Sequence, residues 1–230
     1  MKQLTILLLC ILSFQIAKAQ IFEVGVFAGG SNLIGDVGST SYIAPNQAAF
    51  GGIMKWNRSP RHSWRFSAIY TNFKAQDSKS DDPRRKQRNY TYENNGVIEL
   101  SAGMEFTFWE FNLHYGERIN TPYLYSGITV LNHGNYSFRN NQLFNEDTNS
   151  WAYGIPIVLG YKTTVSPKLI LAVEIGARYT FSDEIDGSVP DNKDIIPRYG
   201  FGNLNNNDWY VFSGLTLTYT FGRNACYCKF

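Results

Sequence analysis

The chain has 230 residues, a formal net charge of +2, 17% charged residues and 16% aromatic residues. So many aromatic residues and so little net charge exclude an intrinsically disordered chain, and a charge of +2 is too small for a protein that binds nucleic acid through a basic surface. Three cysteines are too few for a disulfide-stabilised scaffold.

The N-terminal 19 residues have the pattern of a secretory signal peptide. Lys2 precedes an apolar run over residues 4–16, and Ala17 and Ala19 are the small residues of a cleavage site. An apolar run of about 13 residues is too short to cross roughly 30 Å of hydrocarbon as a helix. We therefore expect cleavage after Ala19, a formally neutral mature chain and a compartment in which disulfides form.

Eight later segments alternate between apolar and polar residues, which is the period of a half-buried strand. The alternating segments are 22–28, 50–56, 64–70, 98–108, 122–131, 151–161, 169–179 and 209–221. The register of 122–131 is ambiguous. Strands of about 9–13 residues are long enough to cross a bilayer at a tilt.

The connections between these segments alternate in length. The shorter ones are 57–62, 109–121 and 164–168; the longer, polar ones are 30–46, 74–95, 132–150 and 182–208. Aromatic residues gather at the strand ends, as they do at membrane interfaces. These features predict an all-β fold over residues 20–221: an eight-stranded antiparallel up-and-down outer-membrane β-barrel. Its long loops would face the outside of the cell. Its short turns and both termini would face the periplasm.

The alternative is a secreted, soluble, lipocalin-like barrel. The polar face of the segments carries Gly, Ser, Thr and few charges, too few for a solvated surface, so we favour a membrane barrel with a polar interior. Charged residues on this face are expected to form ion pairs inside the barrel, because a charge facing lipid costs about 2–4 kcal/mol. The candidates are Glu23, Lys55, Arg65, Glu99, Glu105, Glu174 and Arg178. An interior of eight strands is filled by side chains, so we expect no open pore.

The sequence offers no catalytic motif. His62, His114 and His133 are scattered, with no nucleophile pattern, phosphate-binding loop or metal-ligand cluster around them. We therefore expect no enzyme activity, no metal and no cofactor. The basic run at residues 84–88 lies in the second long loop; a solvated loop is favoured over contact with lipopolysaccharide phosphates.

Residues 222–230 form a predicted periplasmic tail that contains both cysteines of the mature chain, Cys226 and Cys228. A disulfide between them would close a small, strained ring, and strained disulfides are labile. We therefore favour an intermolecular disulfide with a periplasmic partner. A reduced tail without function is the alternative, and metal binding by the two thiolates is less favoured in an oxidising compartment.

Three stretches resemble the PorG family of small outer-membrane barrels from the type IX secretion system. They are EVGVFAGGSNLIGDVG at 23–38, YIAPN at 42–46 and KWNRSPRHSWRF at 55–66, and the similarity recurs at 101–114 and 121–127. The resemblance implies a non-catalytic subunit of the machine that exports surface proteins and serves gliding motility. Such a subunit would sit among outer-membrane lipids, bind other secretion-system subunits, and anchor a periplasmic ring of the lipoprotein PorK (also called GldK) and PorN (GldN).

On this sequence the ring contact is expected at the periplasmic turns and the tail. The candidate contact residues are Arg58, Arg61, His62, Arg118 and Lys168, and Cys226 or Cys228 is the candidate for a covalent link to the ring lipoprotein. Segment 29–46 either plugs the barrel mouth or meets another subunit outside. The alternative function is a small barrel that binds or passes a small solute or lipid.

Overall fold

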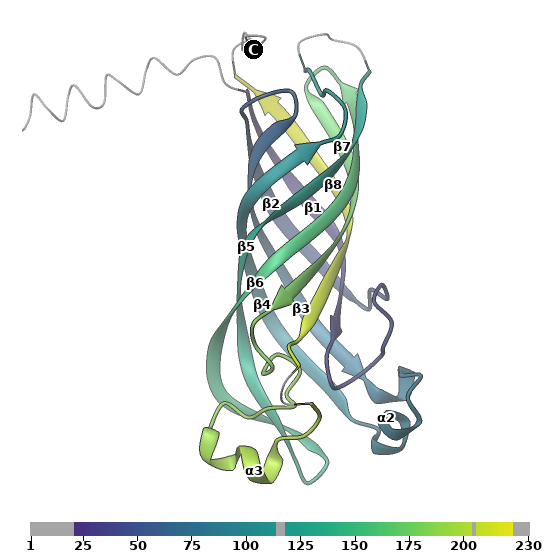
Figure 1. Cartoon of the computed structure of the whole chain (residues 1–230), viewed down its shortest axis with the longest axis vertical. Helices are drawn as coiled ribbons and strands as arrows, with labels where there is room; N and C mark the ends of the chain where they lie inside the picture. The colour runs from purple at the N-terminus through teal and green to yellow at the C-terminus, as the bar shows by residue number, and fades with distance from the viewer. Residues whose placement is uncertain (1–20, 114–117, 204–205, 223–230) are drawn as a thin grey trace, which may run out of the picture.

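The computed structural model describes residues 21–113, 118–203 and 206–222. Eight strands form a closed barrel in which each strand pairs antiparallel with the next and β8 closes on β1 (Figure 1). The strands are β1 (Ile21–Ile34), β2 (Gln47–Asn57), β3 (His62–Gln76), β4 (Thr91–Thr107), β5 (Asn120–Arg139), β6 (Gln142–Ser166), β7 (Leu169–Thr180) and β8 (Trp209–Phe221). The prediction of an eight-stranded antiparallel up-and-down barrel is confirmed.

Short helical segments occupy two connections at one end of the barrel. They are η2 (Asp77–Lys79) and α2 (Pro83–Arg88) between β3 and β4, and η3 (Lys193–Ile195) and α3 (Ile196–Tyr199) between β7 and β8. No helix among the described residues is long and apolar enough to cross a membrane.

Side chains alternate between the two faces of every strand. In β4, Ile98, Leu100 and Met104 are exposed on the outer wall, whereas Glu99 and Glu105 between them are buried inside. This is the two-residue period of a strand, and it follows the apolar and polar alternation of the sequence.

The outer wall of the barrel is apolar. Its large side chains are between about a third and two thirds exposed, as Val26 (58%), Ile128 (67%) and Leu159 (55%) illustrate. Between the aromatic residues at its two ends, the outward face of the described strands carries no charged side chain. Water-soluble proteins rarely expose so large an apolar surface. The barrel therefore spans a membrane, and the soluble lipocalin-like alternative is wrong, because it requires the polar face outside.

The two ends of the barrel differ. We call one the turn end. It holds the connections 58–61, 108–119 and 167–168, the start of β1 and the end of β8. The other is the loop end, with the connections 35–46, 77–90, 140–141 and 181–208. In Figure 1 the turn end is at the top, and the loop end, with α2 and α3, is at the bottom.

One expected loop is wrong. We call the apolar part of the outer wall, between its terminal aromatic residues, the apolar belt. Most of 132–150 is strand, because β5 and β6 continue as a hairpin beyond this belt and turn at Asn140 and Asn141. Both asparagines have a positive φ (51° and 62°), as a two-residue hairpin turn of type I′ requires. The polar residues of this stretch indicated a loop, but outside the membrane a polar strand pairs as well as an apolar one. Similarly, β3 and β4 extend into the expected loop 74–95 and β1 extends to Ile34.

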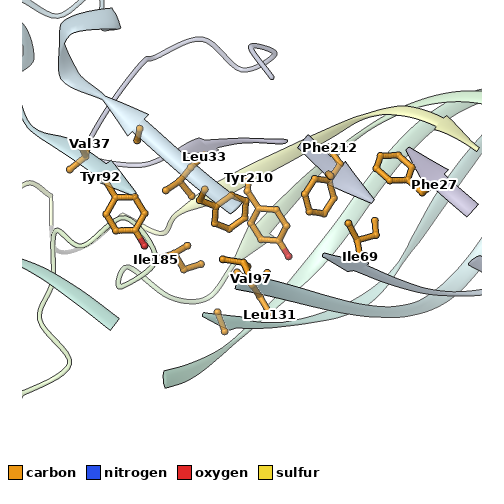
Figure 2. Close-up of a cluster of buried hydrophobic side chains, with 14 of the residues drawn as sticks. Phe27, Leu33, Val37, Ile69, Tyr92, Val97, Leu131, Ile185, Tyr210 and Phe212 are labelled. Carbon is orange, nitrogen blue, oxygen red and sulfur yellow. The ribbon is translucent and has the colours of Figure 1, made fainter. Parts of the chain in front are cut away.

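An apolar cluster closes the interior at the loop end (Figure 2). Leu33, Phe73, Tyr92, Val97, Leu131, Tyr210 and Phe212 from the strands pack with Val37 and Ile185 from the loops. Val37 and Ile185 are completely buried. Part of segment 29–46 thus fills the mouth of the barrel, which was one of its two expected roles.

Candidate functional site

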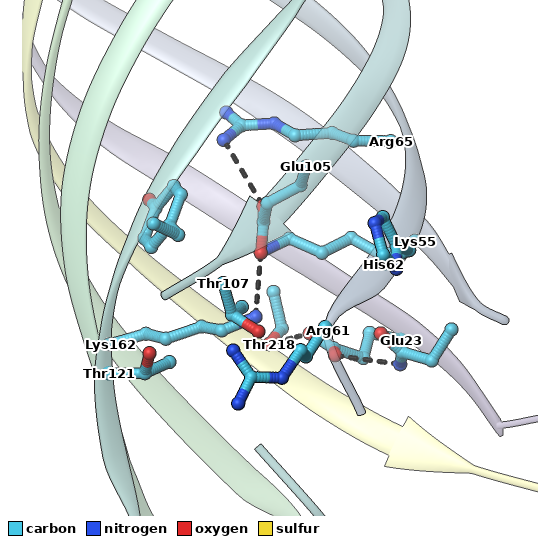
Figure 3. A network of polar contacts seen from close by, with 12 residues as sticks. Glu23, Lys55, Arg61, His62, Arg65, Glu105, Thr107, Thr121, Lys162 and Thr218 are labelled. Carbon is cyan, nitrogen blue, oxygen red and sulfur yellow. Dashed lines mark hydrogen bonds and ion pairs between the residues drawn. The ribbon is translucent and has the colours of Figure 1, made fainter. Parts of the chain in front are cut away.

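The interior of the barrel towards the turn end is a network of buried charges centred on Glu105 of β4 (Figure 3). Lys55 Nζ lies 2.7 Å from one carboxylate oxygen of Glu105, and Lys162 Nζ lies 2.7 Å from the other. Arg65 Nη1 lies 3.9 Å from the same carboxylate. All four side chains are at most 2% exposed. Three strands besides β4 therefore meet at one carboxylate.

The second pair joins Arg65 of β3 to Glu174 of β7 across the interior. The guanidinium donates two hydrogen bonds to the carboxylate, at 2.7 and 2.8 Å, which is the bidentate geometry that arginine favours. The Tyr123 hydroxyl donates a third at 2.6 Å. The guanidinium also lies over the Tyr125 ring, 4.8 Å from its centroid.

The third pair joins Arg178 of β7 to Glu99 of β4 at 3.0 and 3.2 Å. The Tyr210 hydroxyl donates to the same carboxylate at 2.6 Å, and Arg178 also donates to the Gly176 carbonyl. The Arg178 guanidinium packs against the Phe212 ring, so this pair lies where the charged interior meets the apolar cluster.

Two residues depart from the sequence-based expectation. Glu23 makes no ion pair with a described residue; it accepts hydrogen bonds from Asn57 and Thr218, both 2.8 Å long. The reason is that Lys55, its neighbour on β2, extends to Glu105 instead. The sequence pattern does not predict Lys162, because the alternating segment 151–161 stops one residue before it. Strand β6 continues to Ser166, and Lys162 is its next inward residue.

The charged side chains in this part of the interior have no net formal charge. It holds four basic side chains (Lys55, Arg65, Lys162 and Arg178) and four acidic ones (Glu23, Glu99, Glu105 and Glu174), all at most 4% exposed. Every carboxylate accepts from a cation, a hydroxyl or an amide. Buried charges need such partners, since an unpaired one is costly. These ion pairs and hydrogen bonds connect strands on opposite sides of the barrel through its interior.

The basic residues predicted for partner contact lie at the turn end. Arg61 donates to the Phe108 carbonyl at 2.9 Å and lies 3.9 Å from Glu110. The Arg58 guanidinium packs over the Trp56 ring, and the His62 ring packs on Phe106.

Arg118 and Lys168 complete this set. Both are exposed, and neither they nor Arg58 form an ion pair with a described residue. We call Arg58, Arg118 and Lys168 the turn-end cations. Their side chains are available to a partner that carries acidic groups.

Part of the expected site lies outside the described residues. The signal peptide, His114 and both tail cysteines, Cys226 and Cys228, are among these. In the ranges that are described, no group of three or more His, Cys, Asp or Glu side chains is arranged to hold a metal ion.

The basic run at 84–88 is only partly a solvated loop. It forms α2, and Asp82 caps the helix by accepting from the Arg84 amide at 2.8 Å. Arg85 donates to the Gly35 and Gly38 carbonyls, and Arg88 donates to Asp77 at 2.7 Å and to the Asp36 carbonyl. These two arginines hold loops together, a role that the sequence pattern did not indicate.

A family model matches residues 2–230, almost the whole chain. The chain belongs to the DUF6089 family. The description of that family is "domain of unknown function", so membership names no activity. No curated protein matches the chain.

Several solved structures are similar in outline. The N-terminal β-barrel domain of OprF from Pseudomonas aeruginosa is 10% identical and has a TM-score of 0.46, with 89% of this chain and 98% of that one covered. Neisserial surface protein A is 10% identical with a TM-score of 0.46, covering 88% and 97%. A major outer membrane protein from Thermus thermophilus is 12% identical with a TM-score of 0.44, covering 88% and 100%.

Proposed function

We propose that this chain is a non-catalytic structural subunit of the type IX secretion system in the outer membrane, where it anchors the periplasmic ring of PorK and PorN. The proposal starts from the resemblance to the PorG family. Its main structural support is that the interior of this membrane-spanning barrel is filled, by buried ion pairs towards the turn end and by the apolar cluster towards the loop end. A filled barrel is suited to holding something in place rather than to conducting a solute.

The turn-end cations are the expected contact with the ring. They lie on the same end as the last described residue of β8, from which the tail with Cys226 and Cys228 continues. We propose that this end faces the periplasm and that the tail forms a disulfide with the ring lipoprotein. Both contacts would then act on one partner.

The covalent link is tested on the full chain in its native membrane. Outer-membrane fractions are run on reducing and non-reducing gels and probed for this chain. A disulfide-linked adduct that disappears on reduction and in the Cys226→Ser/Cys228→Ser variant supports the link. A monomer in both lanes refutes it.

The ionic contact is tested by charge reversal. Arg58→Glu/Arg118→Glu/Lys168→Glu changes the charge of the turn end by −6, and Arg84→Glu/Lys86→Glu/Lys193→Glu makes the same change on exposed residues of the loop end. We expect the first variant to lose co-purification of the ring proteins and the second to keep it. Equal behaviour of the two variants contradicts the proposal.

The alternative, a barrel that passes a small solute, makes an opposite prediction. Because charged and apolar side chains fill the interior, we expect no reproducible single-channel current when the refolded chain is added to a planar bilayer. A steady current would overturn the structural role in favour of a channel.

A further inference from the structure

Segment 39–46 between β1 and β2 is held at both ends by hydrogen bonds and curves outward between them. We call this segment the bow. At one end the Gly38 amide donates to Asp77 at 2.8 Å. At the other, the Asn46 amide donates to the Ser31 carbonyl at 3.0 Å, and its side chain donates to the Lys74 carbonyl at 2.9 Å. The bow is therefore part of the fold.

The Asn32 side chain fixes the middle of the same bow. Its Nδ2 donates to the Tyr42 carbonyl at 3.1 Å, and its Oδ1 accepts from the Ala44 amide at 3.3 Å. One side chain thus satisfies two backbone groups of the segment and sets its distance from the barrel.

A cavity of about 250 Å³, lined by both polar and apolar residues, lies between the bow and the end of β3. We call it the side pocket. Its polar lining includes Ser39, Ser41, Asn46, Lys74, Gln76 and Lys79. No carboxylate is among the lining residues.

The charge of the side pocket suits an anion. Lys79 is exposed and forms no ion pair with a described residue, while Lys74 pairs with Glu93, whose side chain is 50% exposed. Ser39 Oγ accepts from the Ser41 amide, which leaves its hydroxyl proton for a ligand. Ammonium and hydroxyl donors around a space of this size are the chemistry that recognises a phosphate.

The side pocket lies outside the barrel, just beyond the apolar belt. Lys74 continues the outward row of β3 that includes Phe66 and Tyr70, both about half exposed. Four residues of strand span about 13 Å, which is about 10 Å of height at a tilt near 40°. Lys74 therefore stands at the level of lipid headgroups, and its long side chain can lean back towards them.

The bow also reaches over the outer wall. Pro45 packs against Gly30, an outward residue of β1; a Cβ on that glycine would come within 2.7 Å of Pro45 Cβ. The tip of the bow carries Tyr42 and Ile43, which are 71% and 63% exposed. An apolar pair at this height fits the boundary between headgroups and acyl chains.

We propose that the side pocket binds the phosphate of a membrane-lipid headgroup, with Lys74, Lys79 and the serine hydroxyls as donors, while Tyr42 and Ile43 insert beside its acyl chains. The lipid would fix the orientation of the barrel and hold segment 39–46 against the membrane. This role depends neither on the secretion-system proposal nor on which leaflet the loop end faces.

The test titrates the full mature chain in neutral detergent with single lipids and counts bound lipid by native mass spectrometry. The probes are phosphatidic acid, diacylglycerol as its phosphate-free counterpart, and glycerol 3-phosphate as the water-soluble headgroup. We expect phosphatidic acid to bind and diacylglycerol not to. Equal binding of these two lipids would overturn the proposal.

Variants locate the site. We expect Lys74→Gln/Lys79→Gln to lower the affinity for phosphatidic acid about tenfold or more, since hydrogen bonds to charged groups are lost. The control Lys86→Gln/Lys193→Gln removes the same charge elsewhere at the loop end and should leave the affinity unchanged. If control and test variants weaken binding equally, the side pocket is not the site. A heat-dependent gel shift verifies that each variant is folded.

A second variant tests the role of the lipid tails. Tyr42→Ser/Ile43→Ser keeps the phosphate donors and removes the apolar tip. We expect it to weaken phosphatidic acid binding and to leave glycerol 3-phosphate binding unchanged. If glycerol 3-phosphate binds the native chain as tightly as phosphatidic acid, the pocket serves a soluble phosphate and the lipid assignment fails.

Discussion

Glu105→Gln removes the carboxylate on which the charged interior is centred. Lys55 and Lys162 each lie 2.7 Å from it, so the variant leaves these two buried ammonium groups without their acidic partner. The interior then holds one excess positive charge at a position that is completely shielded from water.

Breaking a buried ion pair by removing one partner costs about 3–5 kcal/mol of unfolding free energy. With an m-value of about 2 kcal/mol/M, the midpoint of urea unfolding should fall by roughly 1.5–2.5 M. The double variant Glu105→Gln/Lys162→Met restores neutrality with an apolar side chain of similar length. It should therefore recover a large part of the loss.

The assay is reversible urea unfolding of the barrel in lipid vesicles, followed by tryptophan fluorescence. Glu110→Gln is the matched control, because Glu110 pairs with Arg61 at the surface at 3.9 Å and its side chain is 66% exposed. Such a pair contributes at most about 1 kcal/mol.

Two results would refute this reasoning. If Glu105→Gln lowers the free energy of unfolding by no more than Glu110→Gln does, the buried network does not stabilise the barrel. If the double variant is no more stable than Glu105→Gln alone, the loss does not come from excess charge.

Three further predictions concern single positions. A Cβ at Gly160 would come within 2.3 Å of the Tyr123 ring, whereas one at Gly52 meets nothing within 4 Å, so Gly160→Ala should lower the urea midpoint by an amount equivalent to about 1–3 kcal/mol and Gly52→Ala should not. Asn141 has φ 62° in the β5–β6 turn, so Asn141→Val should strain the hairpin and speed its hydrogen exchange, while Asn141→Gly should not. Burial and neighbouring carboxylates raise the pKa of Asp183 to about 7. Between about pH 4 and 7, Asp183 therefore holds a proton in the folded chain that it has lost in the unfolded chain. The loop end should become more resistant to protease as the pH falls through this range. If the pH profile of protease resistance is the same in Asp183→Asn, this explanation is contradicted.

Much of the candidate site could be predicted because the inward parity of a strand is a local property. All seven charged residues expected inside the barrel are buried there. The ion pairs themselves could not be predicted. Arg65 pairs with Glu174, 109 residues away, because the stagger of the barrel places β3 opposite β7 across the interior. Glu23 and Lys55, by contrast, face each other on the paired strands β1 and β2 without forming an ion pair.

The sequence by itself determined the strand number, the two faces of each strand and hence the membrane-spanning barrel, since these depend only on alternation and on where it stops. The tertiary structure decided what lies beyond the apolar belt. There polar residues no longer distinguish strand from loop, so the hairpin at Asn140 and the arginine contacts of α2 appear only in the folded chain. The same holds for the side pocket, because Lys74 and Ser39 are brought together by hydrogen bonds between distant segments.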